Sequence, residues 1–283
     1  MSTIDVAGRS RIRWGAPFTY LVALIIAAIC LGPVIYAVLG GFRTTGQIAA
    51  HPAGLPHPWV LDNYKLVLTN SGFWTQVRNS VIVAGVTVSA VVVFGVMAAY
   101  ALSGYEFKGR EVLYNFFLMG MFFPLTVAIL PLFILIRDIN LQGSLLGVAL
   151  PQAAFALPVT IIILRPFLRA LPQELEDAAM IDGCTRLGYF WRIVLPLSRP
   201  GLVTVGVLAF VGSWNAYLLP LLILGNSPTT QTLPLGTASF STQYTANTAA
   251  ILAFTSLAMI PALVFFLLAE RQIVNGLTGA VKG

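Results

Sequence analysis

The chain has 283 residues, of which 58% are hydrophobic and only 9% are charged, and its mean hydropathy is +0.87. Soluble domains carry about 25% charged residues. A soluble globule is therefore excluded, because too little polar surface remains to face water and most of the surface must face lipid.

Apolar runs of about 20 residues are long enough to cross a bilayer as helices. The first such run follows a basic segment, and it is too long for a signal peptide, whose apolar region spans about 7–15 residues. We interpret it as an uncleaved first helix. The sequence predicts an all-α integral membrane protein with six transmembrane helices, over residues 17–39, 80–102, 112–136, 145–168, 202–224 and 248–269.

The basic residues predict the orientation of these spans. An even number of spans leaves both termini on one side, and with the N-terminus inside, 12 of the 16 Lys and Arg residues lie in the cytoplasm. Positive charge favours the cytoplasmic side, so we expect an N-in/C-in topology, and the net charge of +6 is a topology signal that does not require a nucleic-acid partner. The predicted parts are a cytoplasmic tail 1–16, a first transmembrane helix 17–39, an extracytoplasmic loop 40–79, a five-helix core 80–269 and a cytoplasmic C-terminal tail 270–283.

The predicted loop 40–79 contains a proline-rich stretch from His51 to Trp59. Prolines block a helix and favour extended backbone, and the two histidines of this stretch are a poor metal site without further ligands. Asn79 and Ser80 are expected to cap the N-terminus of the second span. The distant Cys30 and Cys184 predict no disulfide.

The third and fourth spans carry Pro124, Pro131, Pro151 and Pro158. Broken helices at membrane depth need protein or a cavity to cover the freed carbonyl groups. The prolines are therefore compatible with a bundle that moves, and equally with ordinary kinks in a static bundle.

Polar residues in two places suggest contact with a solute. Asn215, between Trp214 and Tyr217, lies inside an apolar run, where an amide faces a pathway or makes an interhelical hydrogen bond. The loop 225–247 has no charged residue and is rich in Thr, Ser, Gln and Asn. Such a loop suits a neutral polar ligand or a protein surface, and it also suits simple exposure to water.

The sequence carries no sign of catalysis. It has no glycine-rich phosphate loop, no His-Glu-x-x-His and no Cys/His cluster, so we expect no catalytic residue, no metal and no cofactor in this chain. Ion-driven carriers usually place carboxylates near the midplane, and the spans lack them. The energy for transport is therefore expected from elsewhere, although a secondary carrier and a channel remain as alternatives.

A short acidic segment between the fourth and fifth spans is the most informative feature. Pro172 suits a first turn, Glu174, Glu176 and Asp177 favour the positive end of a helix dipole, and Gly183 suits a left-handed stop. A helix of this length is marginal alone in water. We expect it either to dock onto a partner or to lie on the membrane, followed by an aromatic and basic lead-in, Gly188 to Leu197, to the fifth span.

This segment, Asp177-Ala-Ala-Met-Ile-Asp-Gly183 followed by Ile193-Val-Leu-Pro-Leu197, resembles the EAA motif of ABC import permeases. The resemblance extends to nearly the whole chain and is greatest to the MalG-type carbohydrate permeases. It includes Asn79-Ser80, Ala99 to Leu102, Phe107-Lys-Gly109, Trp214-Asn215, Leu233-Pro-Leu-Gly236 and the tail Gly276 to Gly283.

The resemblance implies a type I ABC importer permease in a bacterial plasma membrane, taking up a sugar or oligosaccharide. Its implied partners are a MalF-like second permease, a MalK-like ATPase dimer that holds ATP and Mg²⁺, and an extracytoplasmic sugar-binding protein. The implied coupling segment is 172–200, with ATPase contacts at Glu174, Glu176, Asp177, Ala178, Ala179, Asp182 and Gly183 and in the tail at Gly279, Ala280, Val281, Lys282 and Gly283. The candidate pathway residues are Trp214, Asn215 and Tyr217, and the loop toward the binding protein includes Gln231, Leu233, Pro234, Gly236, Gln243 and Tyr244.

Two departures from the family pattern stand out. Asp177 replaces the motif glutamate, which keeps the charge and shortens the side chain, and the C-terminal tail is one residue tighter than the commonest form. A permease for another solute, such as an amino acid, an oxyanion or a polyol phosphate, would share the acidic segment and is the first alternative.

Overall fold

The computed structural model describes residues 15–225, 227–241 and 245–281, with side chains for residues 18–225, 227–241 and 245–270. Within these ranges the regular structure is helical, and the β pairing is limited to one bridge between Ser241 and Ala246. This confirms the predicted all-α class. In chain order the elements are α1 Gly15–Gly41, α2 Thr45–Ala50, α3 Asp62–Thr69, α4 Ser71–Gly104, α5 Arg110–Gly120, α6 Leu125–Asp138, α7 Leu145–Arg169, α8 Gln173–Ile181, α9 Arg186–Tyr189, the π-helix η1 Phe190–Val194, α10 Leu195–Leu197, α11 Arg199–Trp214, α12 Leu218–Leu224, the 3₁₀ helix η2 Leu233–Phe240 and α13 Thr248–Val281.

Four helices of the described chain, α1, α4, α7 and α13, are long and apolar enough to cross a membrane. Two bent pairs also qualify when each pair is taken together: α5 meets α6 at 98°, and the stretch from α9 to α10 meets α11 at 73°. The described residues therefore hold four candidate spans, or up to six if each bent pair is one span. The predicted six spans correspond to the upper number.

The break between α5 and α6 lies at Pro124, inside the predicted span 112–136. Proline has no N–H and disfavours helical backbone at the residue before it. Here Pro124 occupies the N-cap of α6 with extended backbone angles, φ −72° and ψ 131°. Its neighbours Pro131, Pro151 and Pro158 lie inside α6 and α7, so one of the four prolines coincides with a sharp bend.

The predicted helix cap at Asn79 and Ser80 is wrong. Helix α4 begins at Ser71, and Asn70 is its N-cap, with a side chain that accepts a hydrogen bond from Gly72 N at 2.8 Å. Asn79 and Ser80 lie further along the same helix and are buried. Their side chains form hydrogen bonds with the loop around residues 229–233. The two residues therefore make a tertiary contact and do not cap a helix.

The predicted loop 40–79 is only partly a loop. It contains α2, α3 and the first turns of α4, whereas the proline-rich stretch around His51 to Trp59 lies outside the helices, as expected. The buried guanidinium of Arg43 organises this stretch, because it donates to the carbonyl oxygens of Pro52 (3.0 Å), Gln47 (2.7 Å) and His51.

The predicted span 202–224 is also interrupted. Helix α11 ends at Trp214 and α12 begins at Leu218, so Asn215 is a helix C-cap rather than a mid-helix residue. Its side-chain Nδ2 donates to the carbonyl oxygen of Val211 at 2.9 Å. Asparagine competes for local backbone groups in this way and favours helix ends.

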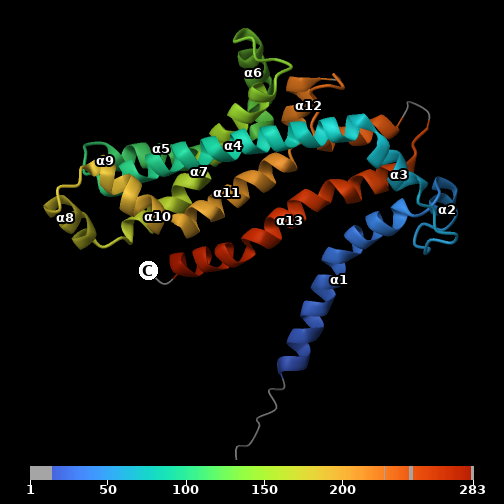
Figure 1. Cartoon of the computed structure of the whole chain (residues 1–283), viewed down its shortest axis with the longest axis horizontal. Helices are drawn as coiled ribbons and strands as arrows, with labels where there is room; N and C mark the ends of the chain where they lie inside the picture. The colour runs from blue at the N-terminus through green and yellow to red at the C-terminus, as the bar shows by residue number, and fades with distance from the viewer. Residues whose placement is uncertain (1–14, 226, 242–244, 282–283) are drawn as a thin grey trace, which may run out of the picture.

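The bundle is built on α4 and α7, which lie side by side along much of their length, with α11 against α4 and α13 against α11 (Figure 1). Small residues permit this approach: a Cβ at Gly95 of α4 would overlap the side chain of Thr160 on α7. Helices α8 and α9 lie at one end of the bundle, and α2 and α3 lie at the other (Figure 1). The fold therefore has two chemically different ends.

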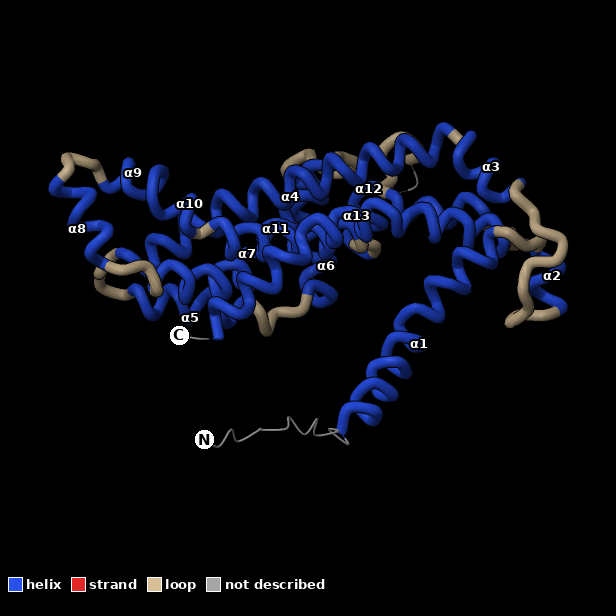
Figure 2. The backbone as a smooth tube through the Cα atoms, turned by 60° about the horizontal axis from the view of Figure 1, so that its bottom comes forward, coloured by secondary structure: helices blue, strands red, loops and turns tan. Residues whose placement is uncertain are grey.

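Helix α1 packs its C-terminal part against α13, and the rest of it diverges from the bundle in both views (Figures 1 and 2). Its large apolar side chains from Phe18 to Val38 are mostly exposed. An apolar surface of this size is covered in the membrane by lipid or by another polypeptide.

Candidate functional site

Helix α8 is a short helix with a well-formed stop. Glu174 and Glu176 lie in its first turn, where they favour the positive end of the dipole. At its end, Gly183 has a φ of +79°, Gly183 N donates to Met180 O at 3.1 Å, and Cys184 N donates to Ala179 O at 2.9 Å. This pair of hydrogen bonds is a Schellman motif, which confirms the left-handed stop predicted at Gly183.

The two alanines of α8 differ in exposure. Ala179 is only 6% exposed and belongs to a cluster of buried residues that includes Tyr189 and Phe190. Ala178 is exposed, together with Glu174, Asp177 and Asp182, while Glu176 is half-buried. Of the two alanines expected to contact the ATPase, only Ala178 offers a surface to a partner.

Sequence reasoning missed two apolar residues at this end of the molecule. Ile181 is 86% exposed at the end of α8, and Leu187 in α9 is 68% exposed. Ile181 follows Ala178 by three residues, which places both on one face of the helix. In the sequence, an isoleucine at the end of an acidic helix is the feature that indicates an apolar contact. The interpretation of this segment rested on its charged residues alone.

The segment that follows the acidic helix α8 packs into the bundle and attaches α8 to it. Tyr189, Phe190 and Val194 are buried against residues of α4, α7 and α11, and the rings of Tyr100 and Phe190 lie 5.0 Å apart. The predicted aromatic and basic lead-in, Gly188 to Leu197, is thus partly buried in the bundle, while Trp191 and Arg192 are exposed. A displacement of α8 would reach three long helices through these contacts.

A charged cluster lies at the same end of the bundle. The guanidinium of Arg165 on α7 is buried, forms an ion pair with Glu111 of α5, and donates through Nε to the carbonyl oxygen of Leu102 at 3.2 Å. Arg169 and Arg110 also pair with Glu111, at 3.2 and 3.3 Å. The cluster ties α5 to α7 and to the end of α4.

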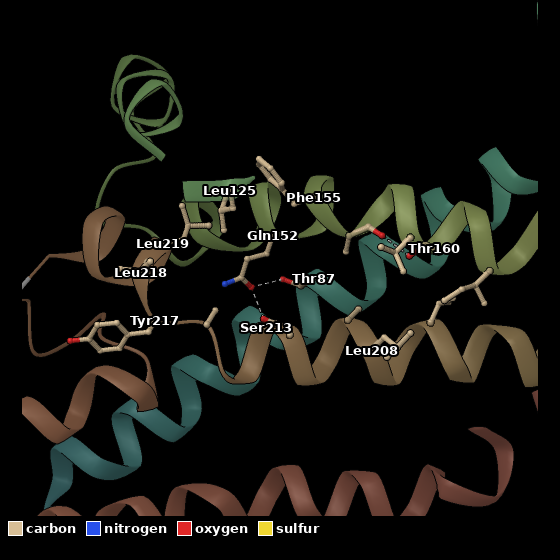
Figure 3. A pocket seen from close by; sticks show the side chains of 17 residues that line it. Thr87, Leu125, Gln152, Phe155, Thr160, Leu208, Ser213, Tyr217, Leu218 and Leu219 are labelled. Carbon is tan, nitrogen blue, oxygen red and sulfur yellow. Dashed lines mark hydrogen bonds between the residues drawn. The ribbon is translucent and has the colours of Figure 1, made fainter. Parts of the chain in front are cut away.

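A cavity of about 580 Å³ lies between α4, α7, α11 and α12 (Figure 3). Its lining is apolar except for Thr87, Gln152, Thr160, Ser213 and Tyr217, and none of its lining residues carries a formal charge. Of the three candidate pathway residues, Tyr217 lines this cavity.

Trp214 and Asn215 lie on a different cavity, of about 470 Å³, between α1, α11, η2 and α13. The indole of Trp214 is buried and donates to Ala258 O at 3.1 Å. The structure therefore does not bring the three candidate pathway residues to one site.

The polar loop 225–247, at the end of the bundle away from α8, is fixed to α4 by hydrogen bonds. Asn79 Nδ2 donates to the carbonyl oxygens of Thr229 and Gln231, both at 2.9 Å, and Ser80 Oγ accepts from Leu233 N at 2.8 Å. Leu233 and Gly236 are buried, and Gln231 and Pro234 are half-buried. The exposed residues of the described loop are 227–229, 238–239, 241 and 245–247, and Gln243 and Tyr244 lie outside the described residues.

The C-terminal tail is not separate from the last span in the described chain. Helix α13 continues through Gly279, Ala280 and Val281, so the predicted boundary at residue 270 does not coincide with a helix end. The side chains of these residues are outside the described part, as are Lys282 and Gly283 altogether.

Comparison with known proteins identifies the family. A family model described as the binding-protein-dependent transport system inner membrane component matches residues 91–274. The diacetylchitobiose uptake system permease protein DasC of Streptomyces coelicolor is 35% identical, over 95% of this chain and 98% of that protein. The arabinooligosaccharides transport system permease protein AraQ of Halalkalibacterium halodurans is 36% identical over 91% and 93%. The sulfoquinovosyl glycerol transport system permease protein SmoH of Agrobacterium fabrum is 32% identical over 100% of both chains.

A solved structure shares the fold. The chain matches a subunit of a bacterial ABC transporter involved in the import of the polysaccharide alginate with a TM-score of 0.76 and 21% identity, over 95% of this chain and 100% of that chain. The likeness extends along the whole bundle, and the match to the family model includes α8, most of the cavity lining and most of α13. The chain belongs to the family of inner membrane components of binding-protein-dependent transport systems.

Proposed function

We propose that this chain is a permease subunit of an ATP-driven ABC importer that takes up a sugar or oligosaccharide delivered by an extracytoplasmic binding protein. The observation that carries the proposal is the geometry of α8, whose acidic and apolar face is exposed while Ala179 is anchored in the bundle. The relatives support the solute class, since their names specify diacetylchitobiose, arabinooligosaccharides and sulfoquinovosyl glycerol.

The exposed face of α8 suits a docking contact better than a passive position on lipid. Glu174 and Asp177 give it negative charge, and Ile181 adds an apolar tip. Burial of this largely exposed isoleucine in a pocket of a partner would be favourable. We infer that the partner is an ATPase subunit, which would supply the ATP and Mg²⁺ that this chain has no motif to bind.

The packing of the segment after α8 suggests how ATPase closure is coupled to movement of the transmembrane helices. ATP-driven closure of the ATPase dimer would move α8, and the buried residues Tyr189, Phe190 and Val194 would pass this movement to α4, α7 and α11. A second, MalF-like permease would supply the remaining wall of the pathway. The exposed apolar surface of α1 is compatible with such a neighbour.

The N-in/C-in orientation is part of the proposal. Helices α1 and α13 pack together where Gly40 approaches Leu252, near the end of α1 and the start of α13. A span that ends at this contact and a span that begins there would leave both termini on one side of the membrane, which we propose is the side of α8. The basic residues predicted on that side agree with a cytoplasmic location.

The uncharged cavity lining is compatible with a neutral, hydroxyl-bearing solute. The lining carries hydroxyl and amide groups and no formal charge, whereas an oxyanion would call for a basic residue or a helix N-terminus. Among the alternatives, importers of amino acids and oxyanions therefore have less support than importers of sugars.

Reconstitution tests the proposal. The tagged chain, co-expressed with its neighbouring genes, is purified in mild detergent, and the captured subunits are counted by mass spectrometry. We expect an ATPase dimer and one different permease, and in proteoliposomes we expect uptake of a labelled sugar, for example diacetylchitobiose or an arabinooligosaccharide, that requires both ATP and the binding protein. A homo-oligomer without an ATPase would contradict the proposal and favour a carrier or a channel.

The C-terminal residues 279–283 are proposed to contact the ATPase dimer. The support is the family-like sequence Gly276 to Gly283 and the course of α13 toward the end of the bundle that carries α8 (Figure 1). Deletion of residues 279–283 is expected to lower ATP-dependent uptake while the two permeases still assemble. Uptake at the normal rate after deletion would remove the tail from the mechanism.

A further inference from the structure

One side chain in the large cavity holds three helices together and still has an unused hydrogen-bonding end. Gln152 of α7 accepts a hydrogen bond through Oε1 from Ser213 Oγ of α11 at 2.6 Å, and Thr87 Oγ1 of α4 lies 3.3 Å from the same oxygen. Figure 3 shows both interactions converging on the amide oxygen. The amide is therefore held in position by α4 and α11.

The other end of the amide has no hydrogen-bond partner among the described residues. Gln152 Nε2 is buried and unpaired, and in Figure 3 it points away from Thr87 and Ser213, toward the side of the cavity where Leu218 and Tyr217 lie. Buried polar groups are nearly always paired, so an unpaired one calls for an explanation. A solute that enters the cavity would provide the missing partner.

The wall toward which this nitrogen points includes backbone that is not helical. It comprises the non-helical break between α11 and α12 and the first residues of α12, including Leu218 and Leu219. The rim residues Tyr217, Leu218 and Leu208 are about half exposed, so the cavity opens on the surface of this chain. A shift of the break would uncover Gln152 Nε2 and connect it to the space beyond the rim.

The chemistry of the site selects the kind of group it would bind. An amide fixed at one end by hydroxyl donors offers its other end to one small polar group, and the surrounding Phe155, Ala156 and Val159 are apolar. A hydroxyl group both donates and accepts, so it pairs with this end of the amide in either orientation of the amide. A cavity of about 580 Å³ is within the range of small-ligand sites.

We propose that Gln152, positioned by Thr87 and Ser213, is the residue through which this subunit hydrogen-bonds a hydroxyl group of the sugar during its passage. This inference rests on the proposed function and adds a contact that sequence reasoning did not identify. The competing role is a purely structural bridge between α4, α7 and α11, and the two roles predict different outcomes for accessibility and for transport.

Accessibility is measured first. Gln152→Cys is made in the complete transporter and treated with the membrane-impermeant thiol reagent 2-sulfonatoethyl methanethiosulfonate, and labelling of residue 152 is read by peptide mass spectrometry with Cys30 and Cys184 left in place. We expect labelling in one nucleotide state to be at least about ten times faster than in the other, because the wall moves during transport. Tyr217→Cys at the rim is the positive control, and Thr204→Cys, buried on α11 outside the cavity, is the negative control.

Transport is measured second, with a labelled sugar that the wild-type complex imports. Gln152→Leu keeps the approximate volume and removes the amide, and loss of one hydrogen bond is expected to lower the maximal uptake rate about two- to tenfold. The binding protein sets the apparent affinity for sugar, which should stay unchanged. Thr204→Val, whose hydroxyl bonds only to Pro200 O of its own helix among the described contacts, should transport at the wild-type rate.

The outcomes separate this inference from the proposed function. If the wild type transports sugar with ATP, while Gln152→Leu assembles, transports normally and only lowers thermal stability, Gln152 is a structural bridge and the inference is wrong. The inference also fails if the Gln152→Cys variant stays unlabelled at position 152 in every nucleotide state while the Tyr217→Cys variant reacts. A wild-type complex that lacks an ATPase would instead overturn the proposed function itself.

Discussion

Ala178 and Ala179 are neighbours in the chain, yet α8 presents them differently: Ala178 is exposed and Ala179 is buried against the bundle. The same short helix therefore carries a surface for a partner and an anchor for the chain itself. This division allows contact and coupling to be separated by experiment.

Arginine at these two positions should give different defects. Ala179→Arg places a charge in a buried apolar cluster, which is costly without a partner for that charge, so we expect a lower melting temperature and poor assembly of the permease. Ala178→Arg should leave the permease folded and disrupt ATPase binding. Melting temperature and ATPase co-purification are measured for both variants, and equal loss of stability in the two would contradict the assigned faces.

Ile181 is expected to be a central contact of the docking face. Ile181→Glu should weaken ATPase binding about 10- to 100-fold, because an apolar side chain that fills a partner pocket is worth about 1.4–2.8 kcal/mol on this scale. Co-purification at graded ATPase concentrations measures the effect. Leu55→Glu is the matched control, since Leu55 is also largely exposed and lies near α2 at the other end of the chain, and it should bind the ATPase normally.

Gly183 should resist substitution because of its backbone conformation. A residue with a Cβ at φ +79° costs about 1–2 kcal/mol, so Gly183→Ala should loosen the end of α8 and lower coupled ATP hydrolysis. Gly183→Asn should be milder, since asparagine tolerates this conformation. Gly85→Ala, in the middle of α4 with open space around its Cβ position, should be neutral or stabilising; if it were as harmful as Gly183→Ala, the argument from φ would be refuted.

The ion pair of Arg165 and Glu111 should matter more than its surface counterpart. Glu111→Gln leaves the buried Arg165 guanidinium without its carboxylate, and removing one partner of a buried charge is strongly destabilising. We expect a lower melting temperature of the purified complex. Asp138→Asn, which breaks the exposed pair with Arg137, should have almost no effect, and similar melting temperatures for the two variants would show that the cluster does not hold α5 to α7.

The sequence was most informative where local rules decide the structure. Glu174 and the stop at Gly183 follow from the helix dipole and left-handed backbone, and both were visible in the chain. The missing N–H of Pro124 explains the bend there, but the chain did not distinguish Pro124 from the three prolines that lie inside helices. It was least informative where a residue type has two uses. The sequence predicts that Asn79 caps a helix, whereas its side chain binds a loop 150 residues away. The sequence places Asn215 inside a helix, whereas it is the C-cap of α11.

The cavity could not be predicted for a related reason. Gln152 comes from one span and its partners Thr87 and Ser213 come from two others, and no local pattern links positions so far apart. The same holds for Ile181, whose meaning depends on which face of α8 the bundle covers. Three-dimensional packing, rather than periodicity, separates the exposed contact residues from the buried anchors.

The central claim is that the exposed face of α8 docks onto an ATPase. The most direct measurement places the photoreactive residue p-benzoylphenylalanine at Ile181 in cells that express the complete transport system, and identifies the cross-linked product by mass spectrometry. The account predicts a cross-link to the ATPase subunit that is absent when the same residue is placed at Leu55. Cross-links to lipid alone, with an ATPase present in the membrane, would show that α8 lies on the bilayer and would contradict the account.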